Sequence, residues 1–141
     1  MIKIQKKDFV LDEEIENVKK KHSNIGAVSS FIGYVRDINN NKEVISIELG
    51  VYERMAYKSL ENISLKAQQT WNLIDFLIIH RFGKLHINEK IVLVTTFALH
   101  RNDSFQACNF IMDYLKKDAP FWKKEHYNDN YEWLENTRLR N

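Results

Sequence analysis

The sequence predicts an α+β domain in which helices pack against a mainly antiparallel sheet. Glycine and proline are scarce, four and one among 141 residues, so most of the chain must lie in regular structure with few turns. Segments whose apolar residues recur every three or four positions, as in amphipathic helices, are interspersed with segments rich in β-branched and aromatic residues, as in strands. With 44% apolar residues, a chain of this length buries one sizeable core, so residues 1–141 are predicted to form a single domain.

The first part of the chain is predicted to begin with a short strand and an amphipathic helix. Leu11, Ile15 and Val18 are spaced by four and three residues, which places them on one face of that helix. A strand is expected from Gly26 to Arg36, followed by a loop in the Asn-rich stretch DINNNK.

The stretch EVISIELGVY, residues 43–52, is predicted to be a half-buried strand. Its apolar residues occupy every second position, which is the period of a strand with one buried face. Gly50 interrupts this pattern and indicates a bulge or a close approach of another part of the backbone. The alternating apolar positions are Ile45, Ile47, Leu49 and Val51.

The rest of the chain is predicted to contain a helix, two buried strands and a last helix. Residues 55–71 repeat apolar side chains every three or four positions, so this helix lays one face on the core. The stretches LIDFLIIHRF and KIVLVTTFALH are almost continuously apolar, which predicts strands covered on both faces, joined by a loop containing Gly83 and Asn88. Asn102 or Asp103 is expected to cap the last helix.

Charge and cysteine content exclude several classes of protein. The formal net charge of +2 provides no global attraction to nucleic acid or membranes, so any basic site must be local. The N-terminus MIKIQKKDF lacks the apolar region of a secretory signal, and no apolar run reaches the roughly 18 residues needed to cross a bilayer. Cys108 has no disulfide partner and is expected to fill the core rather than act as a nucleophile or metal ligand. We therefore expect a soluble cytoplasmic protein.

Local basic character is concentrated in the stretch YLKKDAPFWKKE, residues 114–125, around the only proline. Pro120 should end one helix near Lys117 or Asp118 and start a second short helix. The resulting bend would let Lys116 and Lys123 converge, with the two aromatic residues after the proline packing this corner onto the domain. A lysine that is desolvated or close to another cation has a lowered pKa and can act as a nucleophile or proton carrier.

Three further cations lie where strands end and helices begin. His100 and Arg101 precede the last predicted helix, where unpaired N–H groups favour an anion, and Arg36 ends a strand. Together with Lys116 and Lys123, they are consistent with a pocket for a phosphorylated or carboxylate-bearing ligand. Two simpler interpretations stay open at this point: the lysines form a solvated helix face, and His100 and Arg101 cap or pair locally.

Five stretches, in the same order, make the chain resemble the large, catalytic subunit of molybdopterin synthase. The resemblance runs from about residue 26 to residue 133, and the pattern of His-Arg, a helix and then Y-L-K-x-x-A-P-F-W-K-x-E is its most specific part. The matching stretches are GAVSSFIGYVRD, YERMAYKSL, IIHRFGKL, FALHRNDSFQACNFIMDYLKKDAPFWKKE and the late Trp133. The resemblance also implies a fold similar to an α/β-hammerhead.

The resemblance implies a sulfurtransferase of molybdenum cofactor biosynthesis that converts cyclic pyranopterin monophosphate to molybdopterin. Two sulfurs arrive as a thiocarboxylate on the C-terminal Gly-Gly of a small ubiquitin-like subunit, and two large subunits form the homodimer core of a heterotetramer. It implies no bound cofactor or metal in this subunit.

Residue by residue, the resemblance implies that Lys116 and Lys123 are the catalytic pair. It also implies that the pterin phosphate is bound by Arg36, His100 and Arg101, with the last two reaching into the neighbouring subunit's site. The residues implied to line the pocket as well are Tyr34, Val35, Lys124 and Glu125.

One departure from the family pattern concerns residues 47–50, before the Tyr-x-x-Met segment. Many relatives have Leu-Glu-Tyr-Glu there, whereas this chain reads IELG, so Glu48 is kept and the second acidic position is Gly50. Any contact built on that second carboxylate is therefore in doubt.

Two alternatives belong to other classes of protein. The basic and aromatic C-terminal segment, HYNDNYEWLENTRLRN, could form a nucleic-acid-binding module together with KKDAPFWKKE. Acidic residues interrupt this basic run, however, and the net charge is small. A structural protein that only holds a small partner is the other alternative, and it would tolerate the loss of both lysines.

Overall fold

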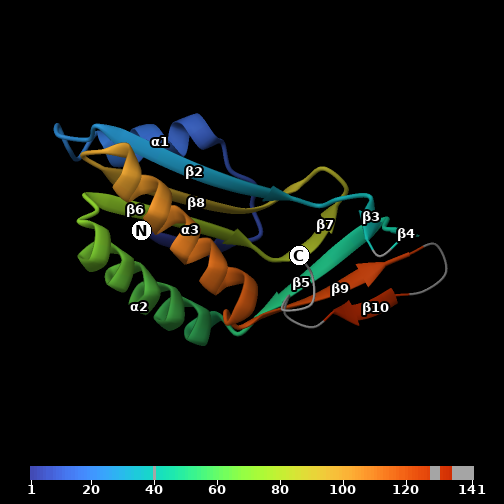
Figure 1. The fold of residues 1–141 in the computed structure, drawn as a ribbon. Coiled ribbons are helices and arrows are strands. Elements are labelled where there is room, and N and C mark those ends of the chain that lie inside the picture. The colour runs from blue at the N-terminus through green and yellow to red at the C-terminus, as the bar shows by residue number, and fades with distance from the viewer. Residues whose placement is uncertain (40, 128–130, 135–141) are drawn as a thin grey trace.

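Two four-stranded sheets and three helices make up most of the part of the chain that the structure describes. The structure is a computed structural model, and it describes residues 1–39, 41–127 and 131–134. The helices lie against the first sheet, and the second sheet extends from one end of it (Figure 1). This arrangement confirms the predicted α+β class. None of the helices in these residues is long and apolar enough to cross a membrane.

The first sheet is mainly antiparallel, as expected. Only β1 and β6 are parallel to each other, and β2 lies at one edge of the sheet. In spatial order its strands are β1 (Ile2–Gln5), β6 (Asp75–Arg81), β8 (Lys90–Ala98) and β2 (Ala27–Tyr34). The sequence placed the end of β2 two residues later, at Arg36.

Helices cover both faces of the first sheet (Figure 1). Leu77 and Ile79 of β6 pack in a cluster with Val18 of α1 (Leu11–Lys19). Ile78, which points to the opposite face, packs against α2 (Glu53–Trp71) and α3 (Arg101–Lys117). Because successive strand residues alternate between faces, strands covered on both sides must be almost continuously apolar, as the sequence predicted.

The second sheet is antiparallel throughout and carries the segment after Pro120. Its buried face packs on a small apolar cluster that includes Ile47, Leu49 and Leu85. In spatial order its strands are β10 (Tyr131–Leu134), β9 (Phe121–His126), β5 (Ser46–Val51) and β7 (Gly83–His86). A two-stranded hairpin, β3 (Ile38–Asn39) and β4 (Lys42–Glu43), lies beside it (Figure 1).

The prediction of a short helix after Pro120 is wrong. The helix α3 ends at Lys117, as expected from a proline that lacks an N–H, but Phe121–His126 then form strand β9. This strand pairs with β5 over Ser46–Val51, so the ladder of hydrogen bonds from a distant segment decides the conformation. Local sequence cannot reveal such a partner.

Two segments that were predicted as loops contain strands. The Asn-rich stretch forms the β3–β4 hairpin, and Asn41 in its turn adopts a φ of 62°, a left-handed conformation that asparagine tolerates. The connection between β6 and β8 contains β7, which begins at Gly83 and pairs with β5. These three strands are too short to produce a periodic sequence signal.

The start of α3 also differs from the prediction. His100 is the N-cap residue, with an extended backbone, and Arg101 is the first helical residue. Asn102 and Asp103 therefore lie inside the first turn instead of capping it, and the Asn102 side chain accepts a hydrogen bond from Gln106. His100 makes no side-chain hydrogen bond to cap the helix.

Candidate active site

The predicted site residues other than Lys124 fall in three places. Lys116 lies in a groove between β2 and α3, and Arg36 and Lys123 lie in a small cavity beside the second sheet. His100 and Arg101 lie at the far end of α3 from Lys116. The two lysines thus occupy separate hollows, one on a helix and one on a strand, on either side of Pro120.

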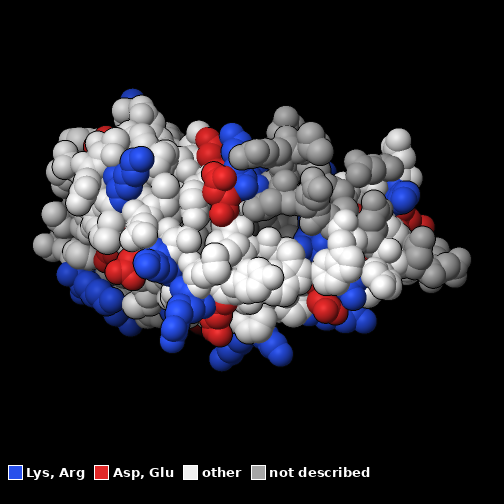
Figure 2. All heavy atoms as spheres, turned by 90° about the horizontal axis from the view of Figure 1, so that it is seen from below, with Lys and Arg blue, Asp and Glu red and all other residues white. Residues whose placement is uncertain are grey.

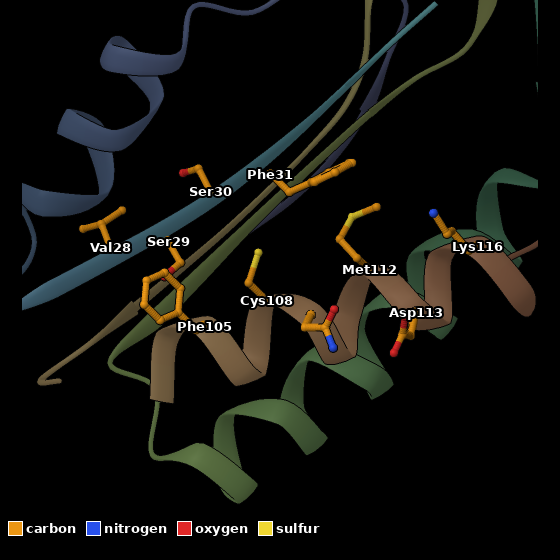
Figure 3. A pocket seen from close by; sticks show the side chains of 10 residues that line it. Val28, Ser29, Ser30, Phe31, Phe105, Cys108, Met112, Asp113 and Lys116 are labelled. Carbon is orange, nitrogen blue, oxygen red and sulfur yellow. The ribbon is translucent and has the colours of Figure 1, made fainter. Parts of the chain in front are cut away.

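The groove between β2 and α3 has a volume of about 420 Å³ and mostly apolar walls. Cys108, Met112 and Lys116 point from α3 toward the side where β2 runs (Figure 3). Phe31 extends from β2 above Met112 (Figure 3), and sequence reasoning missed both of these lining residues. The lining residues are Val28, Ser29, Ser30, Phe31, Phe105, Cys108, Asn109, Met112, Asp113 and Lys116.

Cys108 borders this groove but belongs to the core, as predicted. Its Sγ lies 3.7 Å from the carbonyl oxygen of Val94, and its side chain packs in the same cluster as Ile111. Burial raises the pKa of the Cys108 thiol to about 11, so the reactive thiolate is almost absent at neutral pH. Lys116 is therefore the side chain in the groove best suited to act on an anionic ligand.

The cavity beside the second sheet brings together five of the predicted residues and has a volume of about 40 Å³. In the pairing of β9 with β5, Lys123 and Glu125 lie opposite Leu49 and Ile47, so both point to the buried face of that sheet. Arg36, two residues after the end of β2, lines the same cavity. The lining residues are Tyr34, Val35, Arg36, Ile38, Asn39, Ile47, Ile91, Lys123 and Glu125.

Glu125 is a buried carboxylate in this cavity, with 3% of its surface exposed. The Nδ2 group of Asn39 donates to both carboxylate oxygens, at 2.8 and 2.7 Å, and the Tyr127 hydroxyl donates to Oε1 at 2.8 Å. A buried charge is costly unless it is hydrogen-bonded, which accounts for these donors. Sequence reasoning missed both donors, because Asn39 comes from a distant segment and the two-residue spacing of Glu125 and Tyr127 places them on one side only where the chain is extended.

Lys124 does not line the cavity. Strand alternation turns it to the opposite face, where it pairs in register with Glu48 and Trp133. Its Nζ lies 4.5 Å from the ring centroid of Tyr131 and 4.8 Å from that of Trp133, an arrangement typical of cation–π contacts. The role of Lys124 in substrate binding stays a prediction, and the cavity gives it no support.

The two aromatic residues after Pro120 pack this corner onto the domain, as predicted. The Phe121 ring stacks on His80, with centroids 3.8 Å apart and planes at 18°. The Nδ1 group of His80 donates to the Arg81 carbonyl at 2.8 Å, and burial lowers the pKa of His80 to about 4, so the ring is neutral at pH 7. Trp122 lies over Gly50, so the space beside that glycine is filled by an indole ring and not, as predicted, by backbone.

His100 and Arg101 are exposed and do not join the other cations within one chain. Residues 101 and 116 are fifteen positions apart on α3, which at 1.5 Å per residue separates them by about 22 Å. A single copy therefore cannot place this pair beside Lys116. Among the residues with described coordinates, no group of three or more His, Cys, Asp and Glu side chains is arranged to hold a metal ion.

Known proteins of one family match this chain along most of its length. The model of the MoaE protein family matches residues 4–118. A molybdopterin synthase catalytic subunit from Ralstonia nicotianae is 49% identical over 95% of this chain and 76% of its own length. One from Pseudomonas aeruginosa is 42% identical over 95% of this chain and 89% of its own length.

Solved structures agree with the sequence relatives. The molybdopterin biosynthesis MoaE protein from Burkholderia ambifaria MC40-6 superposes with a TM-score of 0.86 at 41% identity, covering 100% of this chain and 92% of that protein. Molybdopterin synthase from Staphylococcus aureus superposes with a TM-score of 0.85 at 27% identity, covering 94% and 96%. The chain therefore belongs to the MoaE protein family, together with the catalytic subunits of molybdopterin synthase.

Proposed function

We propose that this protein converts cyclic pyranopterin monophosphate to molybdopterin, with Lys116 and Lys123 as its catalytic pair. Two sulfurs are added to the pterin, each carried as a thiocarboxylate by a small ubiquitin-like subunit. The observation that supports this most is the cavity lined by both Arg36 and Lys123 in a member of the MoaE family. We expect the reaction to take place in the cytoplasm, within a single domain formed by residues 1–141.

The charges at the site suit both reactants. The cyclic phosphate and the thiocarboxylate are anions, so fixed cations such as Arg36 and Lys123 can bind them and stabilise the charge that develops as the phosphate ring opens. Lys123 is half-buried, which strengthens its electrostatic interaction with a bound anion. An ammonium group close to the thiocarboxylate can also polarise the acyl group or transfer a proton.

A homodimer would complete the site with His100 and Arg101. The strand β2 lies at the edge of the first sheet, and Val28 and Phe31 on it are exposed, as are Leu99 and Phe105 near the start of α3. Two-fold pairing at this surface would set the α3 helices of the two copies antiparallel. The start of one helix, with His100 and Arg101, would then lie near Lys116 at the end of the other.

The second partner in this proposal is the small sulfur-carrier subunit. The relatives' designation as catalytic subunits supports an assembly with a further subunit. A C-terminal Gly-Gly tail has no side chains beyond hydrogen, so it fits narrow spaces between elements where larger residues would clash. Together with the homodimer, this gives the proposed heterotetramer.

The nucleic-acid-binding alternative gains no support from the comparisons. On the face seen in Figure 2, Lys and Arg side chains form small groups among acidic and uncharged residues. Residues 128–130 and 135–141 of the C-terminal segment on which this alternative depends lie outside the described residues. Binding to generic RNA or DNA with a steep salt dependence would revive it.

Reconstitution tests the proposed function directly. The purified protein would be mixed with a thiocarboxylated small subunit and cyclic pyranopterin monophosphate, and the dithiolene product would be measured. We expect product only when all three components are present. A wild-type protein that makes no product with a partner verified against another catalytic subunit would contradict the proposal.

A further inference from the structure

We propose that Asn39 is a positioning residue of this active site: its side-chain amide fixes the Glu125 carboxylate and thereby holds together the two segments that bring Arg36 and Lys123 to the cavity. This inference rests on the proposed function and adds a residue to it. Asn39 acts through Glu125, so no contact with the substrate is required of it.

The contact between Asn39 and Glu125 is short, buried and charge-assisted. One amide nitrogen donates to both carboxylate oxygens, at 2.8 and 2.7 Å, and the exposed fractions are 9% for Asn39 and 3% for Glu125. Hydrogen bonds to an ionised group are about twice as strong as neutral ones. Together with the bond from the Tyr127 hydroxyl, they restrict the carboxylate to one orientation.

The contact between Asn39 and Glu125 connects the segment of Arg36 to the segment of Lys123. Asn39 follows Arg36 by three residues, and Glu125 follows Lys123 by two. The hydrogen bonds between Asn39 and Glu125 therefore join the two segments that carry the cations. Both partners also line the cavity itself, so the connection lies within the site and not behind it.

Arg36 lies between β2 and β3, outside any strand, and is held from two sides. On one side, the backbone N–H of Val35 donates to the Glu89 carbonyl at 3.0 Å. On the other side, Asn39 provides the side-chain connection to β9. Lys42 reinforces this second side, because its Nζ lies 5.3 Å from the ring centroid of Tyr127. The Val44 N–H also donates to the Asp37 carbonyl at 2.7 Å, next to Arg36. Loss of the Asn39 amide would therefore remove the side-chain connection between this segment and β9 while these backbone hydrogen bonds remain.

The variant Asn39→Asp tests the role with little change in side-chain size. It places a second carboxylate against Glu125 and removes the donor, so we expect kcat/KM at pH 8 to fall about 10- to 100-fold. Activity relative to wild type should recover toward pH 6, because a protonated carboxyl of the pair can donate again. The charged groups around this pair are Arg36, Lys123 and Lys42, whose positive charges lower the pH at which recovery occurs.

A swap variant provides the rescue, and a neighbouring asparagine provides the control. In Asn39→Asp/Glu125→Gln the glutamine amide can donate to the new carboxylate, so the net charge and the connection are both restored. We expect this double variant to recover at least tenfold over Asn39→Asp. Asn41→Asp adds the same charge two residues away, at an exposed position in the same hairpin, and should stay within about twofold of wild type.

The outcomes separate this inference from the proposed function. An active wild type beside an equally active Asn39→Asp overturns the inference alone. So does a folded swap variant that is no more active than Asn39→Asp. If Asn39→Asp fails to fold, a folded swap variant that retains activity supports the inference, and a folded but inactive swap variant overturns it. A wild type that makes no product overturns the proposed function, and the inference falls with it.

Discussion

The indole ring of Trp122 lies directly over Gly50 on the neighbouring strand. The two residues are paired in register between β9 and β5, and a Cβ built on Gly50 would overlap atoms Cε2, Cζ2 and Nε1 of the indole. The ring centroids of Trp122 and Tyr52 are 4.7 Å apart, so the glycine leaves room for an aromatic pair. In this chain, the position where the family resemblance implies an acidic residue serves packing instead.

Replacing Gly50 by alanine should therefore destabilise the protein. The added methyl group has to displace a large ring from between its neighbours, and overpacking of this kind costs about 1–3 kcal/mol. Urea unfolding followed by circular dichroism would measure the loss in free energy of unfolding. The tryptophan emission spectrum of the folded protein should also change, because Trp122 must move.

Gly33→Ala is the matched control, since Gly33 also lies in a strand. A Cβ there would come 3.1 Å from the Cγ1 atom of Val92, a side-chain atom that can shift slightly. We expect a smaller loss of stability than for Gly50→Ala and an unchanged emission spectrum. Equal losses for the two variants would contradict the specific role of the space above Gly50.

The buried His80 should make stability depend on pH. Its folded-state pKa is lowered to about 4 by burial, whereas the unfolded chain binds the proton near the ordinary value of 6.5. The unfolded state therefore binds more protons between these values, and stability should fall as the pH falls from about 6.5 to 4 and then change no further through this group. The contribution amounts to about 3 kcal/mol at most.

His80→Gln removes this titration, so the difference in unfolding free energy between pH 7 and pH 4.5 should be smaller in the variant than in wild type. The exposed His86→Gln should retain the wild-type difference. Identical pH dependence in wild type and His80→Gln would show that His80 does not titrate with a lowered pKa.

Sequence patterns predicted the long elements well and the short ones poorly. The spacing of Leu11, Ile15 and Val18 located α1, and the helix over residues 55–71 was found to within two residues. The strand after Pro120 was mistaken for a helix, because its conformation depends on pairing with β5. Pairing between distant segments leaves no local periodicity, and hairpins with two-residue strands have too few residues to show one.

The candidate site could be predicted in part, for a similar reason. Charged side chains at element ends identified Arg36 and Lys123, which do share a cavity. Lys124 was assigned to the same pocket, although in a strand it points to the face opposite Lys123 and Glu125. This alternation could not be foreseen, because the segment was expected to be helical. Asn39 carried no signal, because an asparagine in an Asn-rich turn resembles any other until its partner Glu125 is known.

If the site is shared between two copies, two inactive variants should complement each other. A mixed dimer of Arg101→Ala and Lys116→Ala would contain one intact site and one site with both changes. After random subunit exchange, an equal mixture should recover about a quarter of wild-type activity. A mixture of Lys116→Ala with Lys123→Ala should stay inactive, because both residues belong to the same chain's half of the site. No recovery in the first mixture would contradict the shared site.

The catalytic role of the two lysines is tested most directly by their single replacement. Dithiolene product would be measured for wild type, Lys116→Ala and Lys123→Ala with a thiocarboxylated small subunit, beside Lys117→Ala as the control at an adjacent exposed position. We expect both catalytic-pair variants to lose at least about 100-fold in rate while melting like wild type, and Lys117→Ala to remain active. Wild-type rates in Lys116→Ala and Lys123→Ala would contradict the proposed mechanism and leave the lysines as a solvated surface.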